Sequence, residues 1–347
     1  MAMRMNALLV GGSGQIGIAA ARALLRAGAS VTIAHRGGRA LPPDLRGHVA
    51  ETTLDRRDQD ALRTLAAGHD LVLDCIAFTA ADAEPYASLV GELGSLVVIS
   101  TASVYLGTNG TWMDIATGDD DFPRFPDPIT EQHPTVEADV EGYSPQKAAL
   151  ERALLAVDGL PVTILRPGAI HGPGSPALRE WYFIKRALDG RRRVPLTDRG
   201  ESRFGTTATA VIAELVRLAA EHPGRRVLNA ADDPAPTALE IGQAVFAHLG
   251  HTAEFELLPR GAGGPESSVG QHPWAVPTPV VMSMQAAQRE LGYEPVGSHR
   301  STIGPAIDDM LAAVGDGDWR ERFPALAQRY GADDWFDYEA EDALLGG

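Results

Sequence analysis

Cysteine is almost absent from this chain of 347 residues, which contains only Cys75. A single cysteine excludes an intramolecular disulfide and is typical of a protein from a reducing compartment. Long apolar runs are also absent, since none approaches the ~20 residues that a membrane-spanning helix needs. The first residues lead directly into an expected strand, so we expect no signal peptide. These absences predict a cytoplasmic protein that does not enter membranes.

Basic residues are scarce relative to acidic ones. The sequence has 30 lysines and arginines against 46 aspartates and glutamates, which gives a formal net charge of -16. Such a charge opposes non-specific binding to nucleic acid or to anionic membranes. Much of the acid lies at Asp119–Asp121 and after Gly315. We therefore expect a small-molecule substrate as the partner, and neither nucleic acid nor a membrane.

Short apolar strands alternate with helices through the first half of the chain. The expected strands are 6–10, 31–34, 71–76, 95–100 and 162–165, and the expected helices are 16–27, 60–67, 80–93 and 146–157. A further strand at 225–230 is expected to return to the same sheet. This alternation indicates a parallel sheet covered by helices on both faces. The sequence therefore predicts an α/β fold with a doubly wound, Rossmann-type parallel sheet.

A glycine-rich turn follows the first expected strand and opens the first expected helix. In such a turn Gly11 permits the tight bend, Gly14 lets the backbone approach a pyrophosphate, and Gly17 allows close helix–strand packing. The amino terminus of the helix adds free N–H donors and a favourable dipole. The candidate cofactor-binding residues of this turn are Gly11, Ser13, Gly14, Gln15, Ile16 and Gly17.

The end of the second expected strand bears on the choice of dinucleotide. An NAD enzyme usually carries Asp or Glu there for the ribose hydroxyls, whereas this chain has His35 and Arg36. Arg36, together with Arg39, would hold a 2′-phosphate through charge-assisted hydrogen bonds. The sequence favours NADP, with NAD as the alternative. Asp55 is a candidate for the adenine amino group, and a cap on the following helix, by Asp55 or Asp58, is the other interpretation.

A second pair of chemically active side chains lies at the start of a later helix. Tyr143 and Lys147 stand four positions apart, so both project from the same helix face. The Lys147 ammonium would favour the phenolate form of Tyr143. Such a phenol passes a proton to or from a carbinol oxygen, while a dinucleotide carries hydride. The turn and the pair together predict a redox enzyme.

Several motifs follow one another along the chain, and they are the glycine turn, Asp55, Ser100-Thr101-Ala102-Ser103-Val104-Tyr105, the Tyr143/Lys147 pair, Leu165-Arg166-Pro167 and Leu291-Gly292-Tyr293. This order resembles that of the extended short-chain dehydrogenase/reductases, the NAD(P)-dependent epimerase/dehydratase family. The resemblance spans about residues 6–311. It implies a homodimer joined by helices 80–93 and 146–157. The apolar seam of that dimer would consist of Leu89, Leu93, Leu150 and Leu154.

The resemblance also implies the roles of the site residues. Thr101 would hydrogen-bond the reacting oxygen, Tyr143 would act as acid and base, and Lys147 would also hold the nicotinamide ribose. Ser103 and Ser100 are the alternatives for the hydroxyl of Thr101. Further cofactor contacts are expected at Cys75, Ala77 and Pro167, with Cys75 interpreted as a core residue rather than a reactive thiol. Substrate contacts are expected at Ser103, Tyr105 and Arg203.

The chain is expected to divide into two domains and a tail. The expected divisions are a dinucleotide-binding domain of residues 1–166 with 204–232 returning to it, a smaller α/β substrate-binding domain of residues 167–203 and 233–314, and an acidic, aromatic tail of residues 315–347. The connection 106–142 is long and rich in Gly, Asp and Pro, and loops of that length are usually functional. We expect it to act as a lid over the substrate.

Departures from the family pattern narrow the chemistry. The 4,6-dehydratases carry Asp-Glu after the catalytic Thr, where this chain has Ala102-Ser103, so elimination of water is not expected. Ala169 replaces an Asn that binds a nucleotide diphosphate, whereas Arg203 matches an Arg that grips it. The expected function is an NAD(P)-dependent oxidoreductase or epimerase acting on a carbinol or ketone of a sugar nucleotide or related natural product. The alternatives are an NADPH-dependent ketoreductase on a non-nucleotide substrate and a non-catalytic NADP-binding sensor or scaffold.

Overall fold

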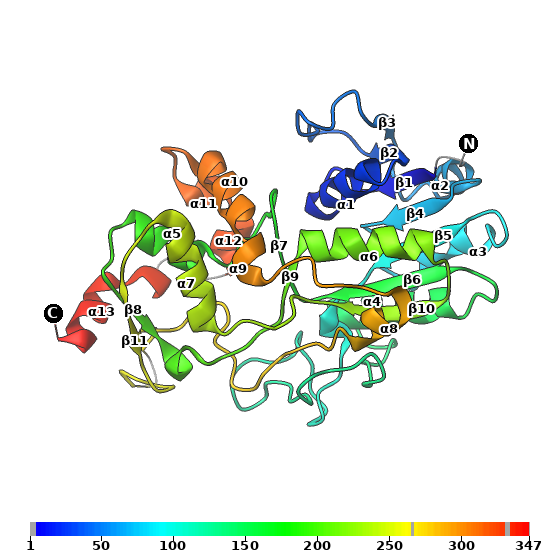
Figure 1. Cartoon of the computed structure of the whole chain (residues 1–347). Coiled ribbons are helices and arrows are strands. Elements are labelled where there is room, and N and C mark those ends of the chain that lie inside the picture. Colours follow the sequence, from blue (N-terminus) through cyan, green and yellow to red (C-terminus); the bar gives the residue numbers. More distant parts are fainter. Residues whose placement is uncertain (1–4, 265–266, 330–333, 347) are drawn as a thin grey trace. The chain divides into compact units, whose positions relative to one another are not determined.

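The computed structural model describes residues 5–264, 267–329 and 334–346. The chain divides into two compact units, which are Met1–Gly168 with Thr209–Ala231 and Met282–Val296, and Ala169–Ala208 with Asp232–Val281 and Gly297–Gly347. We call them unit 1 and unit 2 and describe each by itself (Figure 1). Compared with the expected domains, residues 282–296 join unit 1 and the tail after residue 315 is part of unit 2. Within the described ranges, no helix is both long and apolar enough to cross a membrane.

Unit 1 contains a seven-stranded parallel sheet with the order β10-β6-β5-β4-β1-β2-β3. The strands are β1 (Asn6–Val10), β2 (Ser30–His35), β3 (Ala50–Thr53), β4 (Leu71–Asp74), β5 (Ser95–Ile99), β6 (Val162–Pro167) and β10 (Arg226–Ala230). The strand order reverses between β1 and β4, and doubly wound sheets bind ligands beyond the carboxyl ends of the strands at such a point. The predicted doubly wound α/β fold is confirmed.

Helices cover both faces of this sheet. On one face α1 (Gln15–Arg26) packs on α6 (Thr209–Glu221). On the other, α2 (Gln59–Ala66), α3 (Glu84–Ala87) and α4 (Tyr143–Leu155) share one apolar cluster with Leu8 and Val10 of β1. Leu9, between those two strand residues, is fully buried as well. Because successive strand side chains point to opposite faces, a strand covered on both sides needs the unbroken apolar run seen in the sequence.

The helix expected over 80–93 is much shorter than predicted. Only η1 (Ala80–Ala83) and α3 are helical, and the chain then turns, with Gly91 at a φ of +84°. The four leucines of the expected dimer seam are buried in the core of unit 1, and these are Leu89, Leu93, Leu150 and Leu154. That seam is wrong, because side chains that fill the core of their own chain cannot pack against a second copy. Homodimerisation itself stays a prediction.

The connection 106–142, which is fully described, follows η2 (Ala102–Val104) and contains neither helix nor strand. Its second half is tied to the rest of unit 1. Val136 N donates to Val104 O at 2.8 Å, and Ser283 N, just before α8 (Gln285–Leu291), donates to Ile129 O at 2.8 Å. Ile129 and Val136 are buried. This half is part of the core, so only the first half of the connection keeps the prediction of a lid.

Unit 2 contains two small parallel strand pairs, β7 (Ala169–His171) with β9 (Thr206–Ala208) and β8 (Arg193–Leu196) with β11 (Glu254–Leu257). Its helical elements are α5 (Trp181–Leu188), η3 (Thr197–Gly200), α7 (Ala238–Leu249), α9 (His299–Thr302), α10 (Gly304–Val314), α11 (Trp319–Arg322), α12 (Pro324–Arg329), η4 (Asp334–Phe336) and α13 (Tyr338–Leu345). The residues after 315 join the core of this unit. Trp319 packs against Trp181 with 5.6 Å between the ring centroids, and Glu341 forms a buried ion pair with Arg186.

Candidate active site

The glycine turn lies where β1 ends and α1 begins, at the switch point of the sheet. Gly11 has a φ of +72°, and a Cβ there would approach Cγ2 of Ile76, in the loop after β4, to 2.6 Å. A Cβ on Gly17 would lie 2.3 Å from Gly12 Cα. The backbone itself therefore requires both glycines. Gly11 permits a left-handed turn, and Gly17 lets α1 pack directly on that turn.

The start of α1 is open. Gly14 is its N-cap residue and has no side chain to cap the helix, and a Cβ on Gly14 would meet only Gly11 O, at 3.7 Å. The first N–H groups of a helix lack partners within the helix. The buried Oε1 of Gln15 also finds no partner among the described residues. The free space at Gly14, the first N–H groups of α1 and the helix dipole fit a dinucleotide pyrophosphate.

The residues expected at the adenosine end lie beyond β2 and β3. Arg36 follows β2 and is exposed. Asp55 is partly exposed and pairs with Arg57 at 2.9 Å, and hydrogen bonds from Arg57 lower the pKa of Asp55. Helix α2 is capped by Asp58, which accepts from Ala61 N at 3.0 Å. Capping therefore belongs to Asp58, and Asp55 keeps its predicted contact with adenine.

Tyr143 and Lys147 lie in the first turns of α4 but in different environments. Tyr143 is 48% exposed, whereas Lys147 is 6% exposed. Lys147 Nζ donates to Ala77 O at 2.7 Å and to Ile99 O at 2.9 Å. The Phe78 ring contacts both, with its centroid 5.6 Å from the Tyr143 ring and 5.7 Å from Lys147 Nζ. An exposed tyrosine and a firmly held ammonium thus both lie near the Phe78 ring.

The pKa of Lys147 is subject to opposing effects. Desolvation lowers the pKa of Lys147 below its ordinary value, and the negative charges of Asp74, Glu151 and Asp82 oppose that shift. The two carbonyl acceptors engage two of the three N–H donors of an ammonium group. The remaining donor suits either a ribose hydroxyl or a phenolate, which are the two contacts that the sequence predicts for this lysine.

The loop after β4 contains Ala77, whose carbonyl accepts from Lys147. Two carboxylates fix the backbone of this loop. Asp74 Oδ1 accepts from Ile76 N at 2.9 Å and from Ala77 N at 2.8 Å. Asp82 Oδ2 accepts from the next two backbone N–H groups at 2.7 and 2.8 Å. The buried Arg56 pairs with both carboxylates. The sequence analysis did not single out this trio. A charged residue at the end of a buried strand, Asp74, is the signal that would have pointed to it.

Thr101 follows β5 and is the N-cap of η2. Its Oγ1 lies 3.0 Å from Ser103 Oγ, and Ser144 Oγ lies 3.0 Å from the same Ser103 oxygen. Ser144 Oγ in turn donates to Asp114 Oδ1 at 2.8 Å. A row of hydroxyls therefore runs from the predicted catalytic position to a carboxylate of the 106–142 connection. The sequence analysis missed Ser144 and Asp114. The missing side-chain cap at Gly142, before α4, is the signal that would have suggested a capping residue elsewhere.

Ser100 and Tyr105, two other predicted site residues, use their hydroxyls in buried contacts within unit 1. Ser100 donates to Glu151, which also pairs with Arg166, so its hydroxyl is not the alternative to Thr101. Tyr105 is fully buried, and its hydroxyl donates to Asn229 Oδ1 at 2.6 Å. Burial raises the pKa of Tyr105 to about 12. Tyr105 is a core residue, which corrects its expected role as a substrate contact.

Three further predicted residues keep their assignments as predictions. Burial and the neighbouring Asp74 raise the pKa of the Cys75 thiol, which disfavours a reactive thiolate. Pro167 ends β6 and pairs in register with Ala230 of β10. Arg203 belongs to unit 2, where its carbonyl accepts from Val280 N at 3.0 Å.

Unit 2 has a buried ion pair of its own between β7 and the chain after β10. His171 Nε2 lies 2.7 Å from Asp232 Oδ2, and Asp232 also accepts from Thr206 Oγ1 at 2.7 Å and from Ala208 N at 3.0 Å. Burial opposes a charge on His171, but the hydrogen bond and charge of Asp232 raise its pKa. Burial opposes the Asp232 carboxylate too, yet its partners lower the pKa to about 2. These contacts join β7 to β9, which is a structural role.

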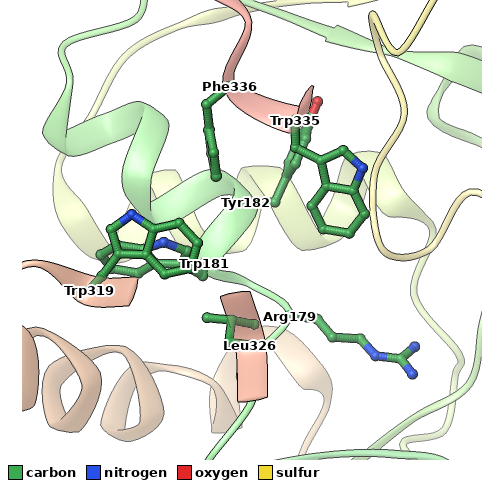
Figure 2. A pocket seen from close by; sticks show the side chains of 7 residues that line it. All are labelled: Arg179, Trp181, Tyr182, Trp319, Leu326, Trp335 and Phe336. Carbon is green, nitrogen blue, oxygen red and sulfur yellow. The ribbon is translucent and has the colours of Figure 1, made fainter. Parts of the chain in front are cut away.

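A small cavity in unit 2 is walled by aromatic rings (Figure 2). Its lining residues are Arg179, Trp181, Tyr182, Trp319, Leu326, Trp335 and Phe336. The indole N–H groups of Trp181 and Trp319 find no acceptor within the described part of the chain. In the figure the guanidinium of Arg179 extends away from the rings. The lining has no carboxylate. The hydroxyl of Tyr182 donates to Pro195 O at 3.2 Å, and burial raises the pKa of Tyr182 to about 12, which disfavours acid–base chemistry in the cavity.

The parallel sheet, the glycine turn at its switch point and the Tyr143/Lys147 pair define a dinucleotide-dependent enzyme of the extended short-chain dehydrogenase/reductase type. The chain belongs to the NAD dependent epimerase/dehydratase family, whose model matches residues 7–231. The matched range contains the turn, Thr101, Tyr143 and Lys147. A search of curated protein sequences found no match.

Solved structures share this fold at low sequence identity. One is dTDP-glucose 4,6-dehydratase from Bacillus anthracis in complex with NAD, with 17% identity, a TM-score of 0.64, and coverage of 93% of this chain and 99% of that one. Another is UDP-glucose 4-epimerase from Thermotoga maritima with UDP-glucose, with 18% identity, a TM-score of 0.62, and coverage of 89% and 100%. A third is WbmG from Bordetella bronchiseptica in complex with NAD and UDP, with 18% identity, a TM-score of 0.63, and coverage of 96% and 98%.

Proposed function

We propose that this protein oxidises a carbinol, or reduces the matching ketone, on a sugar nucleotide or a related natural product, with Tyr143 as acid and base. The observation that carries the proposal is the contrast at the start of α4. Tyr143 is 48% exposed, and one helical turn later Lys147 is 6% exposed with its ammonium held by two carbonyls. An exposed tyrosine one helical turn from a fixed cation is the arrangement that acid–base catalysis by tyrosine requires.

The proposed chemistry follows from these positions. A bound nicotinamide cofactor supplies or accepts the hydride. The first turn of α1 and Gly14 would hold its pyrophosphate, and Lys147 would hold its ribose. Tyr143 would take the proton of the carbinol oxygen as a phenolate, or return it to the ketone oxygen as a phenol. The Lys147 ammonium favours the phenolate, and Thr101 would hydrogen-bond the same substrate oxygen.

NADP is the proposed dinucleotide. Arg36 and Arg39 are both exposed beyond β2, and guanidinium groups bind a 2′-phosphate through paired, charge-assisted hydrogen bonds. The sugar nucleotide is proposed because the related folds from Thermotoga maritima and Bordetella bronchiseptica were solved with UDP-glucose and with UDP. Arg203 would be the diphosphate ligand of such a substrate.

One observation favours the second candidate, a ketoreductase acting on a substrate without a nucleotide. Ala169, the first residue of β7, offers no side-chain amide where diphosphate-binding relatives carry Asn. The two candidates differ in how they treat their cofactor. An epimerase keeps its dinucleotide through the catalytic cycle, whereas a reductase releases it after each turnover.

The test begins with the purified protein as isolated. An absorbance spectrum that shows a co-purified dinucleotide supports the epimerase, and a protein free of it supports the reductase. Calorimetric titration with NADP and NAD then measures affinity, and turnover is assayed on UDP-glucose, UDP-galactose and dTDP-glucose. Failure to bind either dinucleotide would contradict the proposal as a whole. Binding without turnover of these compounds or of a panel of simple ketones would favour the sensor.

A further inference from the structure

The turn that carries Arg36 is built on two glycines. The chain leaves β2 at His35 and continues through Arg36, Gly37 and Gly38. Gly37 and Gly38 have φ angles of +89° and +86°, and both residues are exposed. Glycine adopts such angles at no steric cost, but it also has more conformational freedom to lose than any other residue. A turn of this composition needs an anchor if it is to hold an arginine in one place.

His35 provides such an anchor. Gly37 N donates to His35 Nδ1 at 3.0 Å. The bond joins a side chain to the backbone N–H two residues on, as in the turns that Asn and Asp form. Among the described residues, it is the hydrogen bond that ties the 36–40 turn back to β2. The imidazole is only 13% exposed, at the last position of β2, so the turn is held by a side chain of the sheet.

This bond also fixes where the imidazole proton lies. A backbone N–H can only donate, so Nδ1 of His35 must be unprotonated, and the neutral ring then carries its proton on Nε2. Nε2 lies 3.3 Å from Oε2 of Glu51, in β3. A carboxylate at that place accepts from Nε2, and the bond made by one ring nitrogen determines the protonation of the other. Glu51 therefore keeps Nδ1 available as the acceptor for Gly37 N.

Arg36 lies near the residue expected at the adenine. His35 O accepts from Leu54 N at 3.0 Å, so Arg36 and Asp55 follow two backbone groups that are bonded to each other. Hydrogen bonds from Arg57 lower the pKa of Asp55, and the positive charge of Arg36 contributes to the same shift. The guanidinium of Arg36 thus acts at the proposed adenosine end of the site, and its place there depends on the turn that begins with it.

We propose that His35 is a positioning residue for dinucleotide specificity, because its Nδ1 holds the 36–40 turn so that Arg36 meets the 2′-phosphate of NADP. The inference rests on the proposed function for the NADP site, but the tautomer of His35 is a property of the protein alone. His35 acts through Arg36 and does not itself bind the phosphate. NAD lacks this phosphate, so loss of the anchor lowers affinity for NADPH and leaves affinity for NADH unchanged.

Three substitutions of His35 separate its two ring nitrogens. In His35→Asn the amide oxygen stands where Nδ1 stands and accepts from Gly37 N, because Asn forms this kind of turn readily. In His35→Gln the amide lies as far out as Nε2, so a polar group remains for Glu51 and the bond to Gly37 is lost. His35→Ala removes both. His48→Ala is the matched control, since it removes an exposed imidazole from the same β2–β3 connection.

Calorimetric titration with NADPH and NADH measures the preference of each variant. In His35→Ala and His35→Gln the preference for NADPH is expected to fall roughly two- to tenfold, the value of one hydrogen bond. His35→Asn and His48→Ala are expected to keep the wild-type preference. An unchanged preference in His35→Ala would overturn the proposal, as would an equal loss in His35→Asn and His35→Ala.

A double-mutant cycle shows whether His35 acts through Arg36. Residues that share one interaction have effects that do not add. In the Arg36→Ala background, His35→Ala is therefore expected to cause no further loss of NADPH preference. The same loss in both backgrounds would mean that the imidazole reads the phosphate independently, and this would overturn the positioning role.

Nitrogen-15 NMR of the histidine-labelled protein, without dinucleotide and at mildly alkaline pH, reads the tautomer. The His35 signals are those that disappear in His35→Asn, and they are expected to show Nδ1 unprotonated and Nε2 protonated. A proton on Nδ1 beside a clear preference for NADPH would overturn the role of His35 alone. The expected tautomer in a protein that binds neither dinucleotide, or that binds NADH more tightly, would overturn the proposed NADP site and the role of His35 with it, so the two failures are distinguishable.

Discussion

Two helices of unit 1 begin after a glycine, and their amino ends have opposite uses. Gly14 precedes α1 and Gly142 precedes α4, and neither can cap its helix. The end of α1 has only a backbone oxygen at 3.7 Å from where a Cβ would stand, whereas the end of α4 receives the carboxylate of Asp114. The open end leaves its donors for the proposed pyrophosphate, and Asp114 holds the other end, beside the proposed acid–base residue Tyr143.

The local sequence does not distinguish these two ends. Both present a glycine and then a helix, and what separates them is whether an acceptor arrives from elsewhere in the chain. For α4 that acceptor comes from 30 positions away, in a segment with no regular structure. A helix end in a binding fold is therefore informative only once its partners are known. The comparison predicts that changes at α4 impair turnover and changes at α1 impair cofactor binding.

Tyr143→Phe is expected to have the largest effect. It removes the phenol at the filled helix end and leaves α1 untouched, so turnover should fall by about 10²–10⁴-fold, the usual contribution of a general acid–base group. NADP affinity should be unchanged. Steady-state kinetics and calorimetry on the same preparation measure both. Activity within a few-fold of the wild type would remove Tyr143 from the mechanism.

Gly17→Ala tests the amino end of α1, where a change should impair cofactor binding rather than turnover. A Cβ there would lie 2.3 Å from Gly12 Cα and 2.4 Å from Gly12 O, and backbone atoms cannot move aside as a flexible side chain does. Overpacking of this kind costs about 1–3 kcal/mol of unfolding free energy, and NADP affinity should fall because the turn must shift. Urea denaturation and calorimetry measure these effects. Gly118→Ala is the control, since a Cβ at Gly118 meets nothing within 4 Å.

The parts of the fold that depend on local pattern could be predicted from the sequence. The apolar strand at Asn6–Val10, covered on both faces, and helix α1, which runs from Gln15 to Arg26 where 16–27 is expected, are examples. The prediction of one helix over 80–93 was wrong, because the chain turns after α3, where Gly91 has a positive φ. The predicted dimer seam was wrong because its leucines are buried in the core of unit 1. Apolar spacing shows that Leu150 and Leu154 need a partner, but not whether that partner is the same chain.

The residues of the candidate site also fall into a group that local sequence predicts and a group that it does not. The glycine turn and the Tyr143/Lys147 pair are close in sequence, so their geometry follows from helix and strand periodicity. Asp114 and the Arg56 trio act across 18 to 30 positions, and no periodicity links such residues. Tyr105 was misjudged because an aromatic beside the site motif can face the core, and the partner of its hydroxyl, Asn229, is 124 positions away.

Arg36→Ala tests the adenosine end of the proposed cofactor site. Loss of a charge-assisted hydrogen bond is worth about 1.5–3 kcal/mol, so the preference for NADPH over NADH should fall by about tenfold or more. NADH affinity should stay near its original value, because the change concerns only the 2′-phosphate. Competitive titration of both dinucleotides measures the ratio. Arg63→Ala, at an exposed position of α2 paired with Asp60, should leave it unchanged. Tighter binding of NADH than of NADPH by the wild type would exclude the assignment.

Gly14→Asp is expected to have the smallest effect on stability, and it converts the open helix end into a filled one. Gly14 has extended backbone angles, with φ -84° and ψ 172°, which an aspartate N-cap adopts without strain. Aspartate caps better than glycine by only a few tenths of a kcal/mol, so the free energy of unfolding should rise by about that amount. The same carboxylate would occupy the donors and repel a pyrophosphate, so NADP binding should be lost.

Gly14→Ala separates these two effects. Its Cβ makes only an ordinary contact with Gly11 O, at 3.7 Å, and it brings no acceptor, so alanine should gain no stability and should weaken NADP binding less than aspartate does. Urea denaturation and calorimetry on the two variants decide the matter. If Gly14→Asp is no more stable than Gly14→Ala, the donors of α1 already have partners within the protein. The contrast between the two helix ends would then not explain the separate roles that we propose for them.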